Sequence, residues 1–122
     1  MSKLKIVLAE DNVTFALLLK FVLEKEGYQI LSAVDGQKAI VLIEEHKPDI
    51  VLTDLNMPFV NGLQVISHVR ENLKLNTPII FFSADSIGEM ALEAKKLGAN
   101  DSMEKPFNPM DLATKIQELL EN

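Results

Sequence analysis

Short apolar runs alternate along this chain with longer segments in which apolar residues recur every three or four positions. Continuous apolar runs are typical of buried β-strands, and the longer spacing is typical of helices with one buried face. The predicted strands are residues 4–9, 28–33, 50–53, 79–82 and about 101–103, the last having the weakest pattern. The apolar positions of the predicted helices lie within residues 15–23, 39–43, 63–73, 87–97 and 112–120.

The residues that flank these segments indicate where the helices begin and end. Asp35 can cap the second helix, and Asn108 followed by Pro109 is a typical start for the last one. Gly98 suits the position just beyond the end of the fourth helix, and the second helix must end before Pro48. No linker or repeat interrupts the series, so a single domain is expected.

Strands that alternate with helices predict an α/β fold with a parallel sheet, because helices supply the crossover connections that parallel strands need. The predicted strands are apolar at almost every position, which indicates that helices cover both faces of the sheet. In such folds ligands bind beyond the carboxyl ends of the strands. The functional residues are therefore expected where the strands end.

Composition excludes several classes of function. The 122 residues, 48% of them hydrophobic, can bury a core without a disulfide or a structural metal. The chain has no Cys and two distant His residues, so a metal would be held by oxygen atoms. Its 12 Lys and Arg against 18 Asp and Glu give a net charge of −6, which argues against direct nucleic-acid binding. Without a membrane span or signal peptide, a cytoplasmic protein is expected.

Reactive side chains stand where the predicted strands end, namely Glu10 and Asp11, Asp54, Ser83 and Lys105. If the first and third strands are neighbours, at the usual spacing of about 4.8 Å, Asp11 and Asp54 lie within several ångströms of each other. Two such carboxylates require either a raised pKa or a bound cation. Magnesium with phosphate is the natural candidate, because Mg²⁺ prefers carboxylate, water and phosphate oxygens. Asp54 is then the candidate nucleophile.

Each of these residues also has a structural explanation when taken alone. Glu10 and Asp11 could compensate a helix dipole or cap a helix, and Asp54 could form a turn. Ser83 could open the next helical region, and Lys105 could be a solvated surface cation. Their joint occurrence at four strand ends favours a functional site.

In their order and spacing these residues resemble the receiver domains of two-component response regulators. The resemblance spans residues 1–122 and rests on Glu10-Asp11, Asp54-Leu-Asn-Met-Pro58 with Asn61-Gly62, Ser83-Ala84, Gly98-Ala99-Asn-Asp101, and Lys105-Pro106-Phe107. It implies a flavodoxin-like, doubly wound, five-stranded parallel sheet of order 2-1-3-4-5 with five helices. That order places the first and third strands side by side.

The resemblance also implies a chemistry for each residue. Asp54 would accept a phosphoryl group from a sensor histidine kinase or a phosphotransfer protein. Mg²⁺ would be held by Asp11, Asp54 and the carbonyl of Asn56, with Glu10 acting through water. Phosphoryl oxygens would be bound by Lys105, Ser83 and the Ala84 N–H group. The Lys105–Pro106 peptide would be cis.

Two features concern how the signal is transmitted and how long it lasts. Ser102 stands where the family usually has an aromatic residue that couples to the hydroxyl residue, so the usual aromatic switch is not expected. The family tunes phosphoryl lifetime at the positions of Asn56 and Asp85, and two polar residues there suggest a short lifetime. No output domain follows the last predicted helix within these 122 residues. If they are the whole protein, the signal is expected to pass by contact with a separate downstream protein or by onward phosphotransfer; if they are part of a longer chain, the remainder determines the output.

Two other functions use similar residues. Haloacid-dehalogenase-type phosphatases have an aspartyl nucleophile and magnesium, but they carry a second Asp where this chain has Asn56. A receiver-fold module that interacts without phosphorylation would not need Asp54, Ser83 and Lys105 together. Nucleotide-binding enzymes are disfavoured because no Gly-rich phosphate-binding sequence is present.

Overall fold

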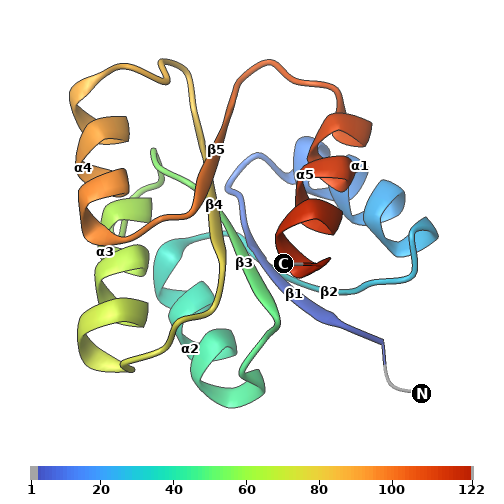
Figure 1. Cartoon of the computed structure of the whole chain (residues 1–122), viewed down its shortest axis with the longest axis horizontal. Helices are drawn as coiled ribbons and strands as arrows, with labels where there is room; N and C mark the ends of the chain where they lie inside the picture. Colours follow the sequence, from blue (N-terminus) through green and yellow to red (C-terminus); the bar gives the residue numbers. More distant parts are fainter. Residues whose placement is uncertain (1–2, 122) are drawn as a thin grey trace.

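The computed structural model describes residues 3–121 and contains a five-stranded sheet between two layers of helices (Figure 1). The strands are β1 Lys5–Ala9, β2 Gln29–Ala33, β3 Ile50–Asp54, β4 Ile79–Ser83 and β5 Asp101–Glu104. The helices are α1 Val13–Lys25, α2 Gly36–His46, α3 Gly62–Ser67, α4 Glu89–Leu97 and α5 Pro109–Glu121, with a π-helical segment, η1, at His68–Asn72. Helices α1 and α5 cover one face of the sheet, and α2, α3 and α4 cover the other.

The sheet is parallel, with the order β2-β1-β3-β4-β5, which confirms the predicted fold. Its register brings the carboxyl ends of the central strands to one edge. Ala9 pairs with Thr53, Asp54 pairs with Phe82, and Ser83 pairs with Glu104. The residue that follows each strand therefore lies at the same edge.

Alternate residues of each central strand enter the two halves of the core. In β1, Ile6 and Leu8 pack in the half that holds α1 and α5, whereas Val7 and Ala9 pack in the half that holds α2, α3 and α4. All four side chains are fully buried. Both faces of the sheet are thus covered, which gives the strand ends a rigid platform.

Helix starts follow local signals that the sequence partly revealed. Asp35 caps α2 by accepting a hydrogen bond from the N–H group of Lys38, as predicted. Asn108 accepts one from the N–H group of Met110 at the start of α5. The first helix is capped by Asn12, whose side chain accepts from the N–H group of Phe15. Glu10 and Asp11 are therefore not needed as the N-cap of α1.

Two predicted helices differ from the observed ones. The third begins at Gly62 as predicted, but its second half is π-helical. The prediction that Ile87 belongs to the fourth helix is wrong, since α4 begins at Glu89 and Ile87 is 81% exposed. Its N–H group donates to the side chain of Asp85, which holds residues 85–88 in a turn. Ile87 was assigned to the helix because its spacing from the apolar residues of α4 fits a helix, although it lies in the preceding turn.

Along residues 3–121 the structure contains no helix with both the length and the apolar character needed to cross a membrane.

Candidate functional site

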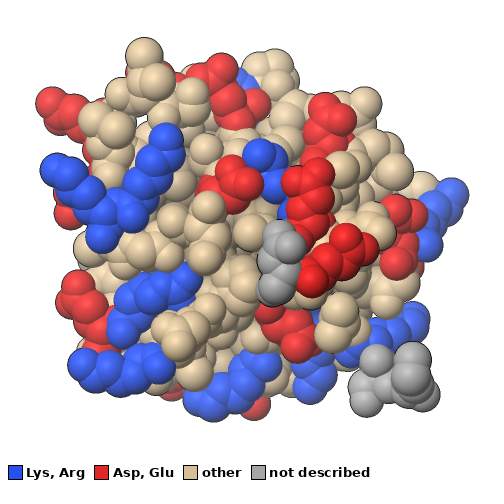
Figure 2. Space-filling model, in the orientation of Figure 1, with Lys and Arg blue, Asp and Glu red and all other residues tan. Residues whose placement is uncertain are grey.

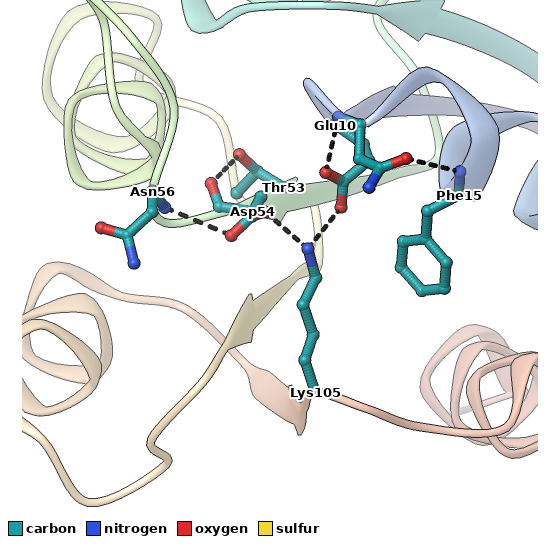
Figure 3. A network of polar contacts seen from close by, with 7 residues as sticks. Glu10, Phe15, Thr53, Asp54, Asn56 and Lys105 are labelled. Atoms are coloured by element: carbon teal, nitrogen blue, oxygen red, sulfur yellow. Dashed lines mark hydrogen bonds and ion pairs between the residues drawn. The ribbon is translucent and has the colours of Figure 1, made fainter.

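Three charged side chains from distant parts of the sequence meet at the carboxyl edge of the sheet (Figure 3). The ammonium group of Lys105 donates to Oδ2 of Asp54 at 2.6 Å and to Oε1 of Glu10 at 2.8 Å. The side chain of Glu10 is completely buried, and that of Asp54 is 9% exposed. This is a buried pair of anions that share one cation.

The sheet itself fixes these residues, because its hydrogen-bond ladder continues beyond the strand ends. The N–H group of Glu10 donates to the carbonyl of Ala33, and that of Lys105 donates to the carbonyl of Ser83. Leu55, which follows Asp54, donates to the carbonyl of Phe82. The charged side chains thus project from backbone that is held on a neighbouring strand.

Glu10, Asp11 and Asp54 form an acidic cluster whose nearest carboxylate oxygens all lie within 4.8 Å of one another. Asp11 is exposed, whereas the other two are buried, so the cluster has one side open to solvent. The sequence predicted this grouping from the neighbouring positions of the first and third strands. Three carboxylates at this separation suit a hard divalent cation with several water ligands.

The environment of the site raises the pKa of both Glu10 and Lys105. Burial raises the pKa of Glu10, and this effect outweighs the hydrogen bonds that Glu10 accepts from Lys105 and from the N–H group of Asn12. The charge of Asp54 raises the pKa of Glu10 further. Burial alone lowers the pKa of Lys105, but the hydrogen bonds and charges of Asp54 and Glu10 raise it overall. Lys105 therefore stays cationic at neutral pH.

Backbone features position the carboxylate of Asp54. Its Oδ1 accepts a hydrogen bond of 3.2 Å from the N–H group of Asn56, and the hydroxyl of Thr53 donates to its carbonyl oxygen. The loop after β3 returns so closely that a Cβ atom on Gly62 would lie 2.3 Å from that carbonyl oxygen. Glycine at position 62 is thus required by the close approach of the chain to Asp54.

A hollow of about 380 Å³ lies beside the acidic cluster, between the loops that follow β3 and β4. Asn56, Ser83, Ala84 and Asp85 are among the residues that line it. The hydroxyl of Ser83 is buried, and it has no hydrogen-bond partner among residues 3–121. A buried polar group without a partner is costly, which points to a ligand atom that this hydroxyl would bind.

Every residue that the sequence assigned to the site lies at this edge of the sheet. Asn56 and Asp85 are exposed at the hollow, and the Lys105–Pro106 peptide bond is cis. Ser102, the residue expected in place of an aromatic side chain, is half-buried in β5.

Two contacts of the site were not predicted. The ring of Phe15, assigned to the core by its helical spacing, lies 5.2 Å from the ammonium group of Lys105. Glu104, which precedes Lys105, accepts a hydrogen bond of 2.9 Å from the N–H group of Ser86 in the loop after β4. Neither contact has a sequence signal, because each depends on which loops the fold brings together.

Comparisons with known proteins agree with this geometry. A model of the response regulator receiver domain matches residues 6–117. The response regulator GtcR of Aneurinibacillus migulanus is 38% identical over 112 residues, which are 92% of this chain and 46% of that protein. This chain spans about half the length of the curated relatives it matches.

Solved structures share the fold over nearly the whole chain. A CheY-like receiver domain protein from Methanospirillum hungatei JF-1 has a TM-score of 0.92 at 26% identity, covering 98% of this chain and 95% of its own. The receiver domain of the sensor histidine kinase PA1611 from Pseudomonas aeruginosa PAO1 has a TM-score of 0.89 at 26% identity, covering 99% and 100%. That structure has a magnesium ion coordinated in its active site cleft.

Proposed function

This chain belongs to the response regulator receiver domain family, whose members are phosphorylation-dependent signalling switches, and on that premise we propose that Asp54 is its phosphoacceptor. The observation that carries this proposal is the 2.6 Å contact between Asp54 and Lys105 within a cluster of two further carboxylates. A nucleophilic carboxylate needs charge neutralisation at the incoming phosphoryl group, and Lys105 supplies it.

The acidic cluster supports a bound Mg²⁺. Asp11, Asp54 and the backbone carbonyl of Asn56 would hold the ion, and Glu10 would act through a bound water. When bound, Mg²⁺ neutralises negative charge between the attacking carboxylate and the phosphoryl oxygens. Asp11 is the exposed member of the cluster and faces the side from which the ion can enter.

In the reaction, an oxygen of Asp54 forms a bond to phosphorus while the bond between phosphorus and the donor's imidazole nitrogen breaks. The bonding electron pair stays on the imidazole. Lys105 binds a phosphoryl oxygen, and the Ser83 hydroxyl gains the partner that it lacks among the described residues. The N–H group of Ala84 binds a further oxygen. This chain thereby assists its own phosphorylation by positioning and charge rather than by acid–base catalysis.

The phosphoryl donor would be a sensor histidine kinase or a phosphotransfer protein, and residues 1–122 would act as one receiver domain. We propose a protein as the downstream target, given the net charge of −6. In the view of Figure 2, basic side chains gather over α3 and α4 and along the lower edge, while acidic ones lie over α5, so this face carries charges of both signs. Asn56 and Asp85 line the hollow beside Asp54 and would orient an attacking water, giving a short phosphoryl lifetime.

Uptake of phosphate from acetyl phosphate tests this proposal directly. With Mg²⁺ present, the wild-type protein should gain one phosphoryl group by intact mass, and Asp54→Asn should abolish the gain. Asp111→Asn, which removes an exposed carboxylate in the first turn of α5, should leave it unchanged. Incorporation that persists in the Asp54 variant would place the nucleophile elsewhere.

Two further results would favour the other functions. Steady multiple turnover of generic phosphoesters would favour a phosphatase of the haloacid dehalogenase type. Failure of the wild-type protein both to take up phosphate and to bind beryllofluoride would favour a module that interacts without phosphorylation.

A further inference from the structure

The ring of Phe15 lies near the ammonium group of Lys105, on the side away from Asp54 (Figure 3). The distance from Nζ to the ring centroid is 5.2 Å, within the range of a cation–π interaction. Phe15 lies in the first turn of α1, and its N–H group donates to the capping side chain of Asn12. The cap therefore fixes the helix turn that carries the ring.

A chain of aromatic contacts connects Phe15 to the core. Its ring meets that of Phe107 edge-on, with centroids 5.3 Å apart, and Phe107 contacts Phe82 at 5.1 Å. Phe82 is fully buried in β4, next to Ser83. The ring beside Lys105 is thus anchored through Phe107 to the strand that carries the phosphate-binding hydroxyl.

The other two partners of Lys105 are carboxylates whose roles change during the proposed reaction. Asp54 loses its charge at the oxygen that becomes bonded to phosphorus, and Glu10 would turn toward metal-bound water. The ring of Phe15 can do neither, because it is neutral and offers no oxygen ligand. Its attraction for the ammonium group therefore persists in every state of the site.

We propose that Phe15 is a positioning residue for Lys105, holding the ammonium group beside Asp54 while the carboxylates exchange partners. This inference rests on the proposed function of Asp54 and Lys105. An open hollow of about 330 Å³ is lined by Asn12, Phe15, Lys105, Pro106 and Phe107, so removal of the ring would enlarge the solvent-filled space beside the ammonium group. The ring thus limits the space that water can fill beside Lys105.

The test compares three variants in otherwise intact protein. Phe15→Leu keeps apolar bulk but removes the ring, and Phe15→Tyr keeps the ring. Phe21→Leu is a matched control, because Phe21 forms a cation–π pair of 4.6 Å with Lys25 on the same helix, remote from the site. Small phosphodonors are used so that docking of a partner protein does not enter the result.

We expect Phe15→Leu to weaken beryllofluoride binding and to slow phosphorylation by acetyl phosphate, each by about 3- to 10-fold. Its Mg²⁺ affinity should be unchanged, because the ring supplies no ligand to the acidic cluster. Phe15→Tyr and Phe21→Leu should match the wild type in all three measurements. A purely structural role for Phe15 would instead lower Mg²⁺ affinity and beryllofluoride affinity together.

Several outcomes would overturn the inference. Wild-type behaviour of Phe15→Leu would do so, as would an equal loss in the Leu and Tyr variants or a parallel loss of Mg²⁺ affinity. In those cases the wild type still takes up phosphate and the proposed function stands. If the wild type neither takes up phosphate nor binds beryllofluoride, the proposed function fails, and the role of Phe15 fails with it.

Discussion

Phe59 lies in the loop after Asp54, and Gly62 begins α3 where that loop ends, but the backbone constrains the two positions differently. Gly62 is required because the chain passes too close to the carbonyl of Asp54 for any Cβ atom. Phe59 has a φ of 66°, in the left-handed region that side chains with a Cβ adopt at a cost. Its side chain is 96% exposed and so gains nothing from packing to offset that cost.

Replacing Phe59 with glycine should therefore stabilise the fold. We expect Phe59→Gly to raise the free energy of unfolding by about 0.5–1 kcal/mol, the left-handed cost reduced by the extra freedom of glycine in the unfolded chain. Urea denaturation measures this change. Phe59→Ala is the control, since it removes the ring but keeps the backbone cost and should give no gain. An equal gain from Ala would attribute the effect to the exposed ring instead.

Residue identity predicted the members of the site but not all of their contacts. Asp11, Asp54 and Lys105 could be proposed because each stands at or just beyond the end of a predicted strand. Phe15 could not, because an aromatic residue at helical spacing looks the same whether it packs only in the core or also against a lysine. The difference arises from the loop after β5, which no local pattern places beside α1.

At the scale of elements, Ser86 and Glu104 connect the loop after β4 to β5. Glu104 accepts a hydrogen bond from the N–H group of Ser86, and this bond lowers the pKa of Glu104 from its usual value of 4.5. A lowered pKa means that the contact favours the folded state above pH 4.5 and is lost as the pH falls through the lowered value. This contact directly links that loop to the residue preceding Lys105.

Removal of this contact should loosen the loop without affecting the rest of the sheet. We expect Glu104→Ala to speed hydrogen exchange at the amide of Ser86 severalfold at pH 7. In the wild type, acidification below the lowered pKa of Glu104 should have the same effect once intrinsic exchange is corrected for. Glu93→Ala, an exposed carboxylate in α4, serves as control. Unchanged exchange at Ser86 in Glu104→Ala would show that the loop is held by other contacts.

The order and type of the elements followed from their periodicity, whereas two boundaries did not. Apolar spacing predicted the third helix through Leu73 but could not reveal the π-helical turn at residues 68–72. There the chain is held by contacts from outside the helix. Arg70 donates hydrogen bonds to the carbonyls of Gly98 and Leu75, residues beyond the reach of a local pattern. Ile87 was misplaced because the competing turn depends on the side chain of Asp85.

At the scale of the whole molecule, burial of Glu10 in the acidic cluster makes the stability of the fold depend on pH. Burial raises the pKa of Glu10, so the folded protein binds this proton more tightly than the unfolded chain does. The contribution of Glu10 to stability is therefore greatest below its usual pKa of 4.5 and falls as the pH rises through the raised value. At neutral pH the ionised carboxylate therefore favours folding less than its protonated form does, even with Lys105 2.8 Å away.

Glu10→Gln should accordingly shift stability and cation binding in opposite directions. Without metal at pH 7, the variant should have a higher free energy of unfolding than the wild type, and its stability should fall less as the pH rises from 4 to 7. Its Mg²⁺ affinity should drop by about 10- to 100-fold, as is typical when an outer partner of a metal site is lost. Addition of Mg²⁺ at 100 times the wild-type dissociation constant should stabilise the wild type by about 2.7 kcal/mol and the variant by much less.

Chemical denaturation with and without Mg²⁺ measures both quantities, and Glu93→Gln controls for the loss of an exposed negative charge. A metal-free variant less stable than the wild type would mean that the contact between Glu10 and Lys105 outweighs the burial of the charge.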